Sequence, residues 1–481
     1  MAWKLLSVAV IAIALLTPAA AGAATATTIG PGTKPGLAVD AAGTAYIAYN
    51  GPEVNNNAPL LFCRLPRGAT VCDAGIAKDL GAAGNSLSRP FVTVTGDRVV
   101  VVQYRYGAGV AGFGQLYRFT SADRGGSFAP GAAVGKIGFT EAVAGPGDTL
   151  SGVTESDACG MCFQNVVLSG DAPVDTEGRT TVPYAVLSST RPYGGAVGLV
   201  DAATPLAVFA DGSGAQQFRR YTGSGSLNDQ ASWSAPADIA DPLAAPKLAG
   251  GPSGLFMLGN APGNAIMVRK FDGAAFGPSV QIGGALGVNQ HLFQDAAGRL
   301  HAVWHRFGES GIELVHAVSD DGVTWTSGVA VTQPGADDFG DPRVATAPDH
   351  VGVVVWHAQE GIRTAPVGPG APAKLRPLFK ANGSAKRKGG KVRYQVSSEI
   401  LRPDGVTPAA GCSGTVVVTL LRGDKQVARK TAKVDNACRF AVHGKIRGAK
   451  VKGAQNLTVR AAFSGNTVFR ARTQTGSASI K

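Results

Sequence analysis

The chain has 481 residues, a net charge of +12, and a composition rich in glycine (66 residues) but low in charged residues (16%). Its apolar fraction of 44% is enough for a folded core, while glycine and proline together stay below the share typical of low-complexity disorder. Long helical heptads are absent from the sequence, which excludes coiled coils and helical bundles and favours strands joined by turns.

The N-terminus has the pattern of a secretory signal peptide. A positively charged start at residues 1–4 precedes an apolar stretch at residues 5–16 and small residues at 21–23 that fit a cleavage site. The apolar stretch is too short to span a bilayer comfortably. We therefore expect residues 1–23 to be removed and the mature protein to be secreted or extracellular, with retention at the cell surface left open.

Six cysteines fall into three pairs that are close in sequence. The pairs are Cys63 with Cys72, Cys159 with Cys162, and Cys412 with Cys438. Their spacing and the expected export favour three structural disulfides over the other pairings that six cysteines allow. A redox role for the second pair would need a βαβ setting, and a zinc site would need a second pair at ligand spacing. We expect no metal and no cofactor.

Residues 24–365 contain a repeated unit, in which an apolar strand, a turn rich in Asp, Gly or Pro, and a second apolar strand follow one another. Its copies lie at 35–50, 90–105, 141–154, 246–260, 290–305 and 342–357, with a less regular copy in 183–221. The period of roughly 45–55 residues is the length of one four-stranded propeller blade. The pattern predicts an all-β fold with a β-propeller of six or seven blades, the irregular copy leaving the number open.

Two turns between strands share the form Ser-x-Asp-x-Gly-x-Ser/Thr-aromatic. Their members are Ser121, Asp123, Gly125 and Phe128 in the first turn, and Asp320, Gly322 and Trp325 in the second. Degenerate versions lie at 226–233 and 272–276. In such a turn the Asp accepts backbone N–H bonds, Gly takes a positive φ, and the aromatic ring packs between sheets. These turns resemble the Asp-box (BNR) repeats of the sialidase superfamily of β-propellers over most of residues 30–370, and the resemblance implies that both aspartates serve folding rather than catalysis.

The start of the first strand and the end of the second strand of each blade lie at the same mouth of the propeller. Polar and charged residues recur at these positions. The residues expected on this ligand-binding face are Lys34, Arg89, Arg105, Glu155, Lys247, His291, His305, Asp341, Arg343 and His357. The cations at several strand starts suit an anionic ligand, although a propeller mouth is also polar without one. The equivalent places of His305 and His357 in the repeat explain this pair without a metal.

The resemblance to sialidases implies three arginines on the substrate carboxylate, a Tyr–Glu nucleophile pair, an Asp acid/base and an Arg-x-Pro signature at the first strand. The corresponding place here reads Thr-Lys-Pro at 33–35 and lacks the arginine. A substitute catalytic set can still be written as Arg89, Arg191 and Arg343 with Tyr193 and Glu141. Nothing in the spacing demands this set. The leading hypothesis is a non-catalytic propeller that binds a glycan or similar ligand; the alternatives are a sialidase-type exo glycoside hydrolase and a structural envelope protein.

The C-terminal residues 374–481 differ from the rest in charge. They follow a Pro/Gly-rich linker at 366–373 and carry 23 Lys and Arg against four acidic residues, a balance of +19 that leaves −7 for the other residues. Five alternating segments in this region predict a β-sandwich that resembles bacterial Ig-like modules.

The basic C-terminal module suggests which partners the protein has. We expect a glycan or an anionic cell-surface polymer. The aromatic stacking pattern of a single-strand nucleic-acid binder is missing, so we expect no nucleic-acid partner. We also expect a monomer without a transmembrane segment after signal removal.

Overall fold

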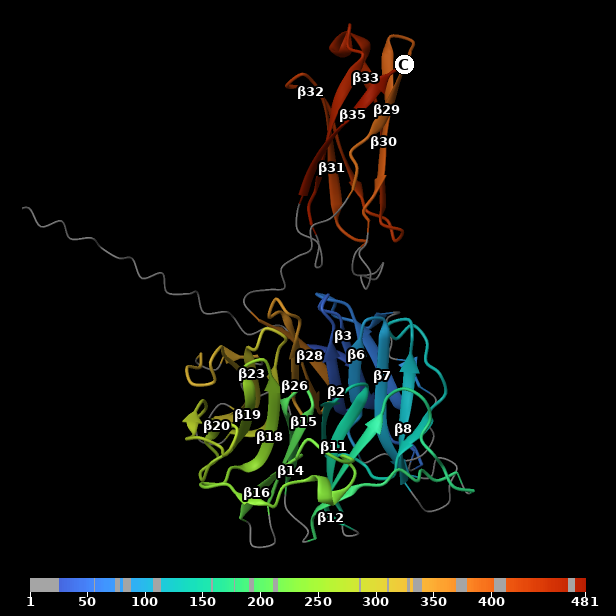
Figure 1. Cartoon of the computed structure of the whole chain (residues 1–481). Coiled ribbons are helices and arrows are strands. Elements are labelled where there is room, and N and C mark those ends of the chain that lie inside the picture. The colour runs from blue at the N-terminus through green and yellow to red at the C-terminus, as the bar shows by residue number, and fades with distance from the viewer. Residues whose placement is uncertain are drawn as a thin grey trace, which may run out of the picture.

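The computed structural model describes residues 26–481, except 56, 74–77, 81–87, 107–113, 157–158, 177, 190–193, 211–214, 285–286, 309–310, 327–328, 332–339, 369–378, 402–411 and 466–471. The expected signal peptide lies outside the described residues. The described part is built of β-strands, with short 3₁₀ turns at Gln230–Ser232 and Gly448–Val451 (Figure 1). None of its helices is long and apolar enough to cross a membrane.

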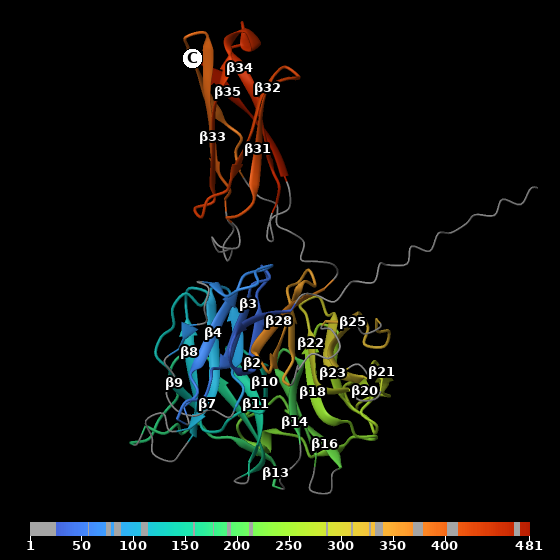
Figure 2. The same cartoon turned by 180° about the vertical axis from the view of Figure 1, so that it is seen from behind.

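Seven four-stranded antiparallel sheets form a seven-bladed β-propeller (Figure 2). Blade one contains β2 (Thr33–Val39), β3 (Ala45–Asn50), β4 (Leu60–Leu65) and β5 (Lys78–Asp79), and blade two contains β6 (Phe91–Thr95), β7 (Arg98–Tyr106), β8 (Gly114–Ser121) and β9 (Ala132–Gly135). Blade three contains β10 (Glu141–Gly145), β11 (Thr149–Ser156), β12 (Gly160–Val167) and β13 (Ala185–Ser188), and blade four contains β14 (Gly195–Asp201), β15 (Thr204–Ala210), β16 (Gln216–Arg220) and β17 (Ala237–Asp238).

The remaining blades follow the same order. Blade five contains β18 (Ala244–Gly251), β19 (Gly254–Asn260), β20 (Ile266–Lys270) and β21 (Val280–Gln281), and blade six contains β22 (Gly287–Gln294), β23 (Leu300–Gly308), β24 (Gly311–Ser319) and β25 (Val329–Ala330). Blade seven contains β26 (Arg343–Thr346), β27 (Gly352–Ala358), β28 (Gly361–Val367) and β1 (Thr27–Gly30). The irregular copy at 183–221 contains three of the four strands of blade four, and the number of blades is therefore seven.

The ring is closed by the N-terminal strand. β1 pairs antiparallel with β28, so the first strand of the chain becomes the outermost strand of the last blade. Ile29 of β1 packs in one apolar cluster with Val355 and Ile362 of blade seven. This closure joins the two ends of the propeller sequence, and first strands of neighbouring blades such as β14, β18 and β22 lie side by side.

Two tryptophans at equivalent places in blades six and seven belong to the core between blades. Trp304 and Trp356 are fully buried, with 1% and 0% of their surface exposed. Trp304 shares an apolar cluster with Val268 of blade five, and Trp356 shares one with Val303 of blade six. Both side chains therefore pack one blade against the one before it.

The first serine–aspartate turn has the bonding expected of it. Ser121 Oγ donates to Asp123 Oδ1 at 2.7 Å, and Asp123 Oδ1 accepts the backbone N–H of Ser127 at 2.8 Å. These hydrogen bonds, that of Ser121 above all, lower the pKa of Asp123 to about 2. Phe128 packs edge-on against Phe62 of blade one, with ring centroids 4.7 Å apart. The turn therefore ties blade two to blade one.

In the second turn the prediction of Asp320 is wrong, because Asp321 accepts the hydrogen bonds of the turn. Asp321 Oδ1 accepts the N–H of Thr324 at 2.7 Å and the hydroxyl of Ser319 at 3.0 Å. Asp320 instead forms an exposed ion pair with Arg299 at 2.6 Å. In the first turn one residue separates Asp123 from Gly125, whereas Asp321 directly precedes Gly322. The spacing of the first turn therefore points to Asp320 instead of its neighbour.

We expect the substitution Asp321→Ala to lower the melting temperature (Tm) of the propeller, because it removes the acceptor of backbone N–H groups in the turn. Asp320→Ala removes only an exposed ion pair, which contributes little, and should change the Tm by less than about 1 °C. Calorimetry of the two variants beside the wild type measures the difference. Equal shifts in the two variants would contradict the assignment of Asp321.

The C-terminal module is a separate all-β unit. Its strands are β29 (Gly383–Lys388), β30 (Lys391–Glu399), β31 (Thr415–Arg422), β32 (Lys425–Lys433), β33 (Arg439–Arg447), β34 (Asn456–Phe463) and β35 (Arg472–Ile480). They join in one seven-stranded sheet in the order β32-β31-β34-β35-β29-β30-β33. The parallel pairing of β29 with β35 links strands that a sandwich would place in separate sheets, and the two edge strands contact each other. The β-rich character is confirmed, whereas the Ig-like sandwich stays a prediction.

The three predicted disulfides are present. Cys63 is bonded to Cys72 and staples the segment that follows β4 in blade one. Cys159 is bonded to Cys162 in blade three, and Cys412 is bonded to Cys438 in the C-terminal module. Each bond closes a local loop, as the spacing of the cysteines predicts.

Candidate functional site

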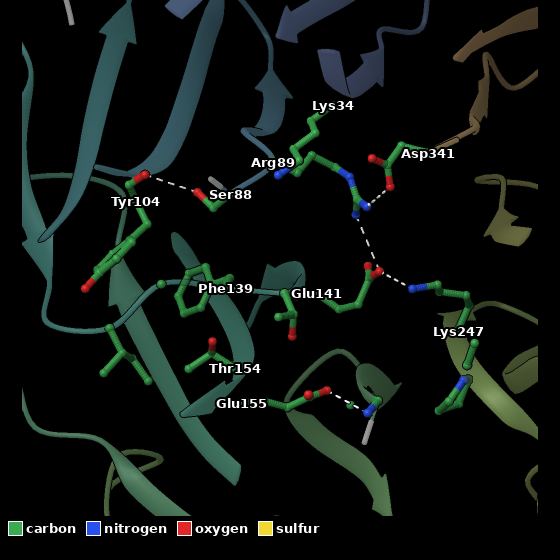
Figure 3. A pocket seen from close by; sticks show the side chains of 17 residues that line it. Lys34, Ser88, Arg89, Tyr104, Phe139, Glu141, Thr154, Glu155, Lys247 and Asp341 are labelled. Carbon is green, nitrogen blue, oxygen red and sulfur yellow. Dashed lines mark hydrogen bonds and ion pairs between the residues drawn. The ribbon is translucent and has the colours of Figure 1, made fainter. Parts of the chain in front are cut away.

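A cavity of about 530 Å³ lies at the mouth of the propeller, where first strands begin and second strands end. Figure 3 shows the residues that line it, which come from every blade except blade six. The labelled residues are Lys34, Ser88, Arg89, Tyr104, Phe139, Glu141, Thr154, Glu155, Lys247 and Asp341. The topology of the blades thus brings residues more than 300 positions apart to one site.

Glu141 is the centre of the charge network in this site. It is the first residue of β10, and its Oε1 lies 3.4 Å from Arg89 Nη1 and 3.5 Å from Arg343 Nη2. Lys247 donates a short hydrogen bond to the same oxygen. Arg89 also pairs with Asp341, with 2.6 Å between Nη2 and Oδ1. Three cations from three blades therefore converge on one carboxylate.

The environment keeps Glu141 ionised. Burial alone would raise the pKa of this carboxyl, but Lys247 and Arg89 outweigh burial, so its pKa lies below the ordinary glutamate value. Burial has the opposite consequence for His291, whose pKa falls to about 3. His291 Nδ1 accepts the backbone N–H of Val344 at 3.2 Å, so the neutral ring carries its proton on Nε2.

An aromatic wall faces this charged side of the cavity. Figure 3 shows Tyr104 and Phe139 together on the side opposite Lys247 and Asp341. Ser88 Oγ donates to the backbone oxygen of Tyr104 at 3.1 Å, which fixes the loop beside the tyrosine. The cavity therefore combines an apolar face with hydrogen-bonding groups of both signs, which is the usual design of a small-molecule site.

The structure brings together most, but not all, of the residues predicted for this face. Those that line the cavity are Lys34, Arg89, Glu155, Lys247 and Asp341. Arg343 and His291 lie behind it as buried or half-buried partners of the charge network. Glu155 accepts the backbone N–H of Gly194 at 2.7 Å and so holds the rim of the cavity in place.

Three predicted residues lie elsewhere. Arg105 is 1% exposed and donates to the backbone oxygen of Ala58 at 2.6 Å, between blades one and two. His305 is 1% exposed in β23 and lines no cavity described at this mouth. His357 lines a second cavity of about 360 Å³, which shares Lys34 with the first.

Of the substitute catalytic set, Arg89, Glu141 and Arg343 come together as described above. Arg191 and Tyr193 lie outside the described residues. The sequence reasoning missed Tyr104 and Phe139. Strand alternation gives a signal for Tyr104, because neighbouring residues on a strand point to opposite faces and Tyr104 precedes the buried Arg105 on β7. Phe139 lies in a loop and follows no such pattern.

No known protein family and no curated protein matches the sequence. Solved structures match this chain at low sequence identity. An α-L-arabinanase of Penicillium chrysogenum complexed with arabinobiose is 11% identical, with 72% of this chain and 98% of that chain covered and a TM-score of 0.40. The GH93 α-L-arabinofuranosidase of Fusarium graminearum is 10% identical, with 72% and 97% covered and a TM-score of 0.40. The SapL1 lectin in complex with α-methyl fucoside is 15% identical, with 64% and 99% covered and a TM-score of 0.37. These likenesses concern the fold.

Proposed function

We propose that the protein is a secreted or cell-surface propeller that binds a glycan in the cavity at its mouth. The single observation that carries this proposal is the cavity itself, in which Glu141, Arg89, Asp341 and Lys247 form a fixed set of charged donors and acceptors. Such groups bond hydroxyls more strongly than neutral groups do. Their mutual pairing means that no reorganisation is needed when a ligand enters.

The aromatic wall adds the second element of sugar binding. A pyranose ring has polar hydroxyl edges and apolar C–H faces, and Tyr104 and Phe139 offer an apolar surface opposite the charged groups. A volume of about 530 Å³ suits a mono- or disaccharide, since small-molecule sites usually span roughly 300–1,000 Å³.

A glycan array that includes neutral sugars, uronic acids and sialosides tests this proposal on the mature chain. The array should record both retention of the protein and loss of terminal sugar from each spot. We expect retention on a restricted group of glycans without sugar loss. Silence on every spot would contradict the proposal.

A sialidase-type exo glycoside hydrolase is the second candidate, because two of the arginines named for it meet Glu141. The same contacts favour binding over catalysis. Arg89, Arg343 and Lys247 are already paired with the carboxylates of Glu141 and Asp341, so a substrate carboxylate would have to displace these pairs. Release of terminal sugar on the array would support the enzyme and overturn our choice.

The proposal includes the assignments suggested by the sequence. The paired serine–aspartate turns support a relationship to the Asp-box propellers of the sialidase superfamily, with Asp123 and Asp321 in the structural role. The three disulfides fit an extracellular protein. For the C-terminal module we propose an Ig-like fold and a role in attaching the protein to an anionic surface.

Exposed cations on the C-terminal sheet support attachment to an anionic polymer. Across β29, β30 and β33, Lys386 lies opposite Arg393, which lies opposite Lys445. A second row two residues away contains Lys388, Lys391 and Arg447. All six side chains are exposed, and like charges placed directly opposite each other are destabilising. These two rows of cations, called the grid below, lower the stability of the folded module. We therefore infer that the grid serves binding.

Replacement of Lys386, Arg393 and Lys445 by glutamine should weaken binding of the mature chain to a polyanion such as dextran sulfate, and should reduce its dependence on salt. The matched control replaces Lys425, Arg429 and Lys433 of β32, which are exposed but lie outside the grid. Retention on a dextran sulfate column at several salt concentrations measures both variants. Equal losses in the two variants would mean that net charge, and not the grid, determines binding.

A further inference from the structure

A cluster of titratable side chains lies between blades six and seven, at the strand ends opposite the mouth cavity. Asp295 follows β22, His301 is the second residue of β23, and His350 lies in the turn between β26 and β27. Asp295 Oδ2 is 2.5 Å from His350 Nδ1 and 3.4 Å from His301 Nε2, and the three atoms all lie within 4.8 Å of one another. Asp295 and His301 are fully buried, and the His350 side chain is 26% exposed.

Comparison with blade one shows what is particular about this cluster. The turn at 295–299 has the same backbone hydrogen bonds as the turn at 40–44. In blade one Asp40 accepts the hydroxyl of Tyr46 at 2.9 Å, six residues further on. In blade six the residue six positions after Asp295 is His301, so an imidazole replaces the phenol. The structural role of this aspartate therefore does not require a histidine.

His350 is a second exception to the repeat. The turn at 347–351 again has the same hydrogen bonds, and the fourth residue of these turns is Gly43 in blade one and Gly298 in blade six. Both glycines have positive φ values, 83° and 90°. His350 adopts φ 65° at the same place, a conformation that is unfavourable for a residue with a side chain. Its side chain, pointing at Asp295, offsets this cost.

Hydrogen bonds to neighbouring groups fix which atoms of the cluster face one another. Asp295 Oδ1 accepts the N–H groups of Ala297 at 3.0 Å and Arg299 at 2.9 Å, which leaves Oδ2 directed at the two histidines. His301 Nδ1 lies 3.2 Å from His316 Nε2, and the two rings are stacked. With its proton on Nδ1, facing His316 Nε2, the His301 ring would present the Nε2 lone pair to a metal ion, an arrangement usual behind metal-binding histidines.

We propose that Asp295 Oδ2, His301 Nε2 and His350 Nδ1 bind a zinc ion that joins blade six to blade seven. Two nitrogens and one carboxylate oxygen form a frequent zinc-ligand set, with water in the remaining position. At zinc–ligand distances of about 2.0–2.1 Å, tetrahedral ligand atoms lie roughly 3.3 Å apart. The Asp295–His301 distance already fits, and His350 must withdraw by less than about 1 Å. The ion would take the place of the hydrogen bond between His350 Nδ1 and Asp295 Oδ2.

Zinc titration of the full mature chain tests the proposal directly. The protein is produced without a histidine tag, stripped with a chelator, and mixed with ZnCl₂. After desalting we expect about one zinc per chain by elemental analysis, and a rise in Tm of about 3–6 °C at saturating zinc. Co²⁺ should add visible absorption bands of a tetrahedral site. Absence of bound zinc, or the same rise with Ca²⁺ or Mg²⁺, would overturn the proposal.

Two variants restore the residues that blade one has at these positions. His301→Tyr recreates the Asp40–Tyr46 pair, and His350→Gly recreates the glycine turn, so both should fold without zinc. We expect each to retain at most about a tenth of the wild-type zinc and to show no zinc-dependent rise in Tm. The control His443→Gln, on the C-terminal module, should retain one zinc. Full zinc binding by both cluster variants would contradict the site.

Discussion

Replacement of Glu141 with glutamine is expected to lower the free energy of unfolding of the propeller by about 3 kcal/mol, because buried cations lose their counter-charge. Arg89, Arg343 and Lys247 approach Glu141 Oε1, and none of the three side chains is more than 22% exposed. Glutamine has the shape of glutamate, so the substitution changes charge without leaving a void. Urea unfolding of a protein of residues 24–481 at pH 7 measures the loss.

The control for this substitution is Glu313→Gln. Glu313 pairs with Arg306, whose side chain is 41% exposed, so water compensates the loss of the ion pair. We expect this control to lose less than about 1 kcal/mol. Equal losses in the two variants would show that Glu141 is not the centre of a buried network.

The effect of Glu141 should also depend on pH in a defined direction. The pKa of this carboxyl is lower in the folded protein than its ordinary value, chiefly because Lys247 and Arg89 outweigh burial. Its contribution to stability is therefore complete above the ordinary glutamate pKa, and it is lost as the pH falls through the lowered value. The difference between wild type and Glu141→Gln should shrink in acid. A difference that stays constant down to acid pH would contradict this network.

Local patterns were sufficient to predict the blades. Each blade is a set of consecutive strands joined by turns, so the repeat and its period appear directly in the sequence. Closure of the ring could not be predicted in this way, because β1 pairs with β28 more than 300 residues later. The same holds for the C-terminal module, where the parallel pairing of β29 with β35 makes one sheet from the predicted sandwich strands.

The blade topology was sufficient to predict which face of the propeller carries the cavity. It did not predict the direction in which single side chains point. Arg105 and Tyr104 are neighbours at the end of β7, and one step along a strand moves a side chain to the other face. The arginine is buried between blades, whereas the tyrosine lines the cavity. The choice between Asp320 and Asp321 failed for a related reason, since a turn shorter by one residue changes which aspartate faces the backbone N–H groups.

The proposed zinc site shows a different limit. Asp295 and His350 belong to different blades and are 55 positions apart, so no ligand spacing marks them in the sequence. Alignment of the repeats against one another contains the signal, because histidine takes the place of Tyr46 in blade six and of Gly43 in blade seven.

The central claim of a glycan site at the propeller mouth can be tested with a pair of matched aspartates. Asp341 lines the cavity and has a left-handed backbone with φ 50°. Asp241 has nearly the same conformation, φ 51°, and does not line the cavity. Asparagine tolerates this conformation well, so Asp→Asn at either place preserves the backbone. Asp341→Asn removes from the site a charge that is paired with Arg89, whereas Asp241→Asn leaves the site unchanged.

The measurement is calorimetric titration of the glycan that the array retains best into wild type, Asp341→Asn and Asp241→Asn. Loss of a charged hydrogen-bond acceptor from the site should weaken binding by Asp341→Asn at least about tenfold, or about 1.4 kcal/mol. Asp241→Asn should bind as the wild type does. Equal affinities of all three proteins would contradict a glycan site in the mouth cavity.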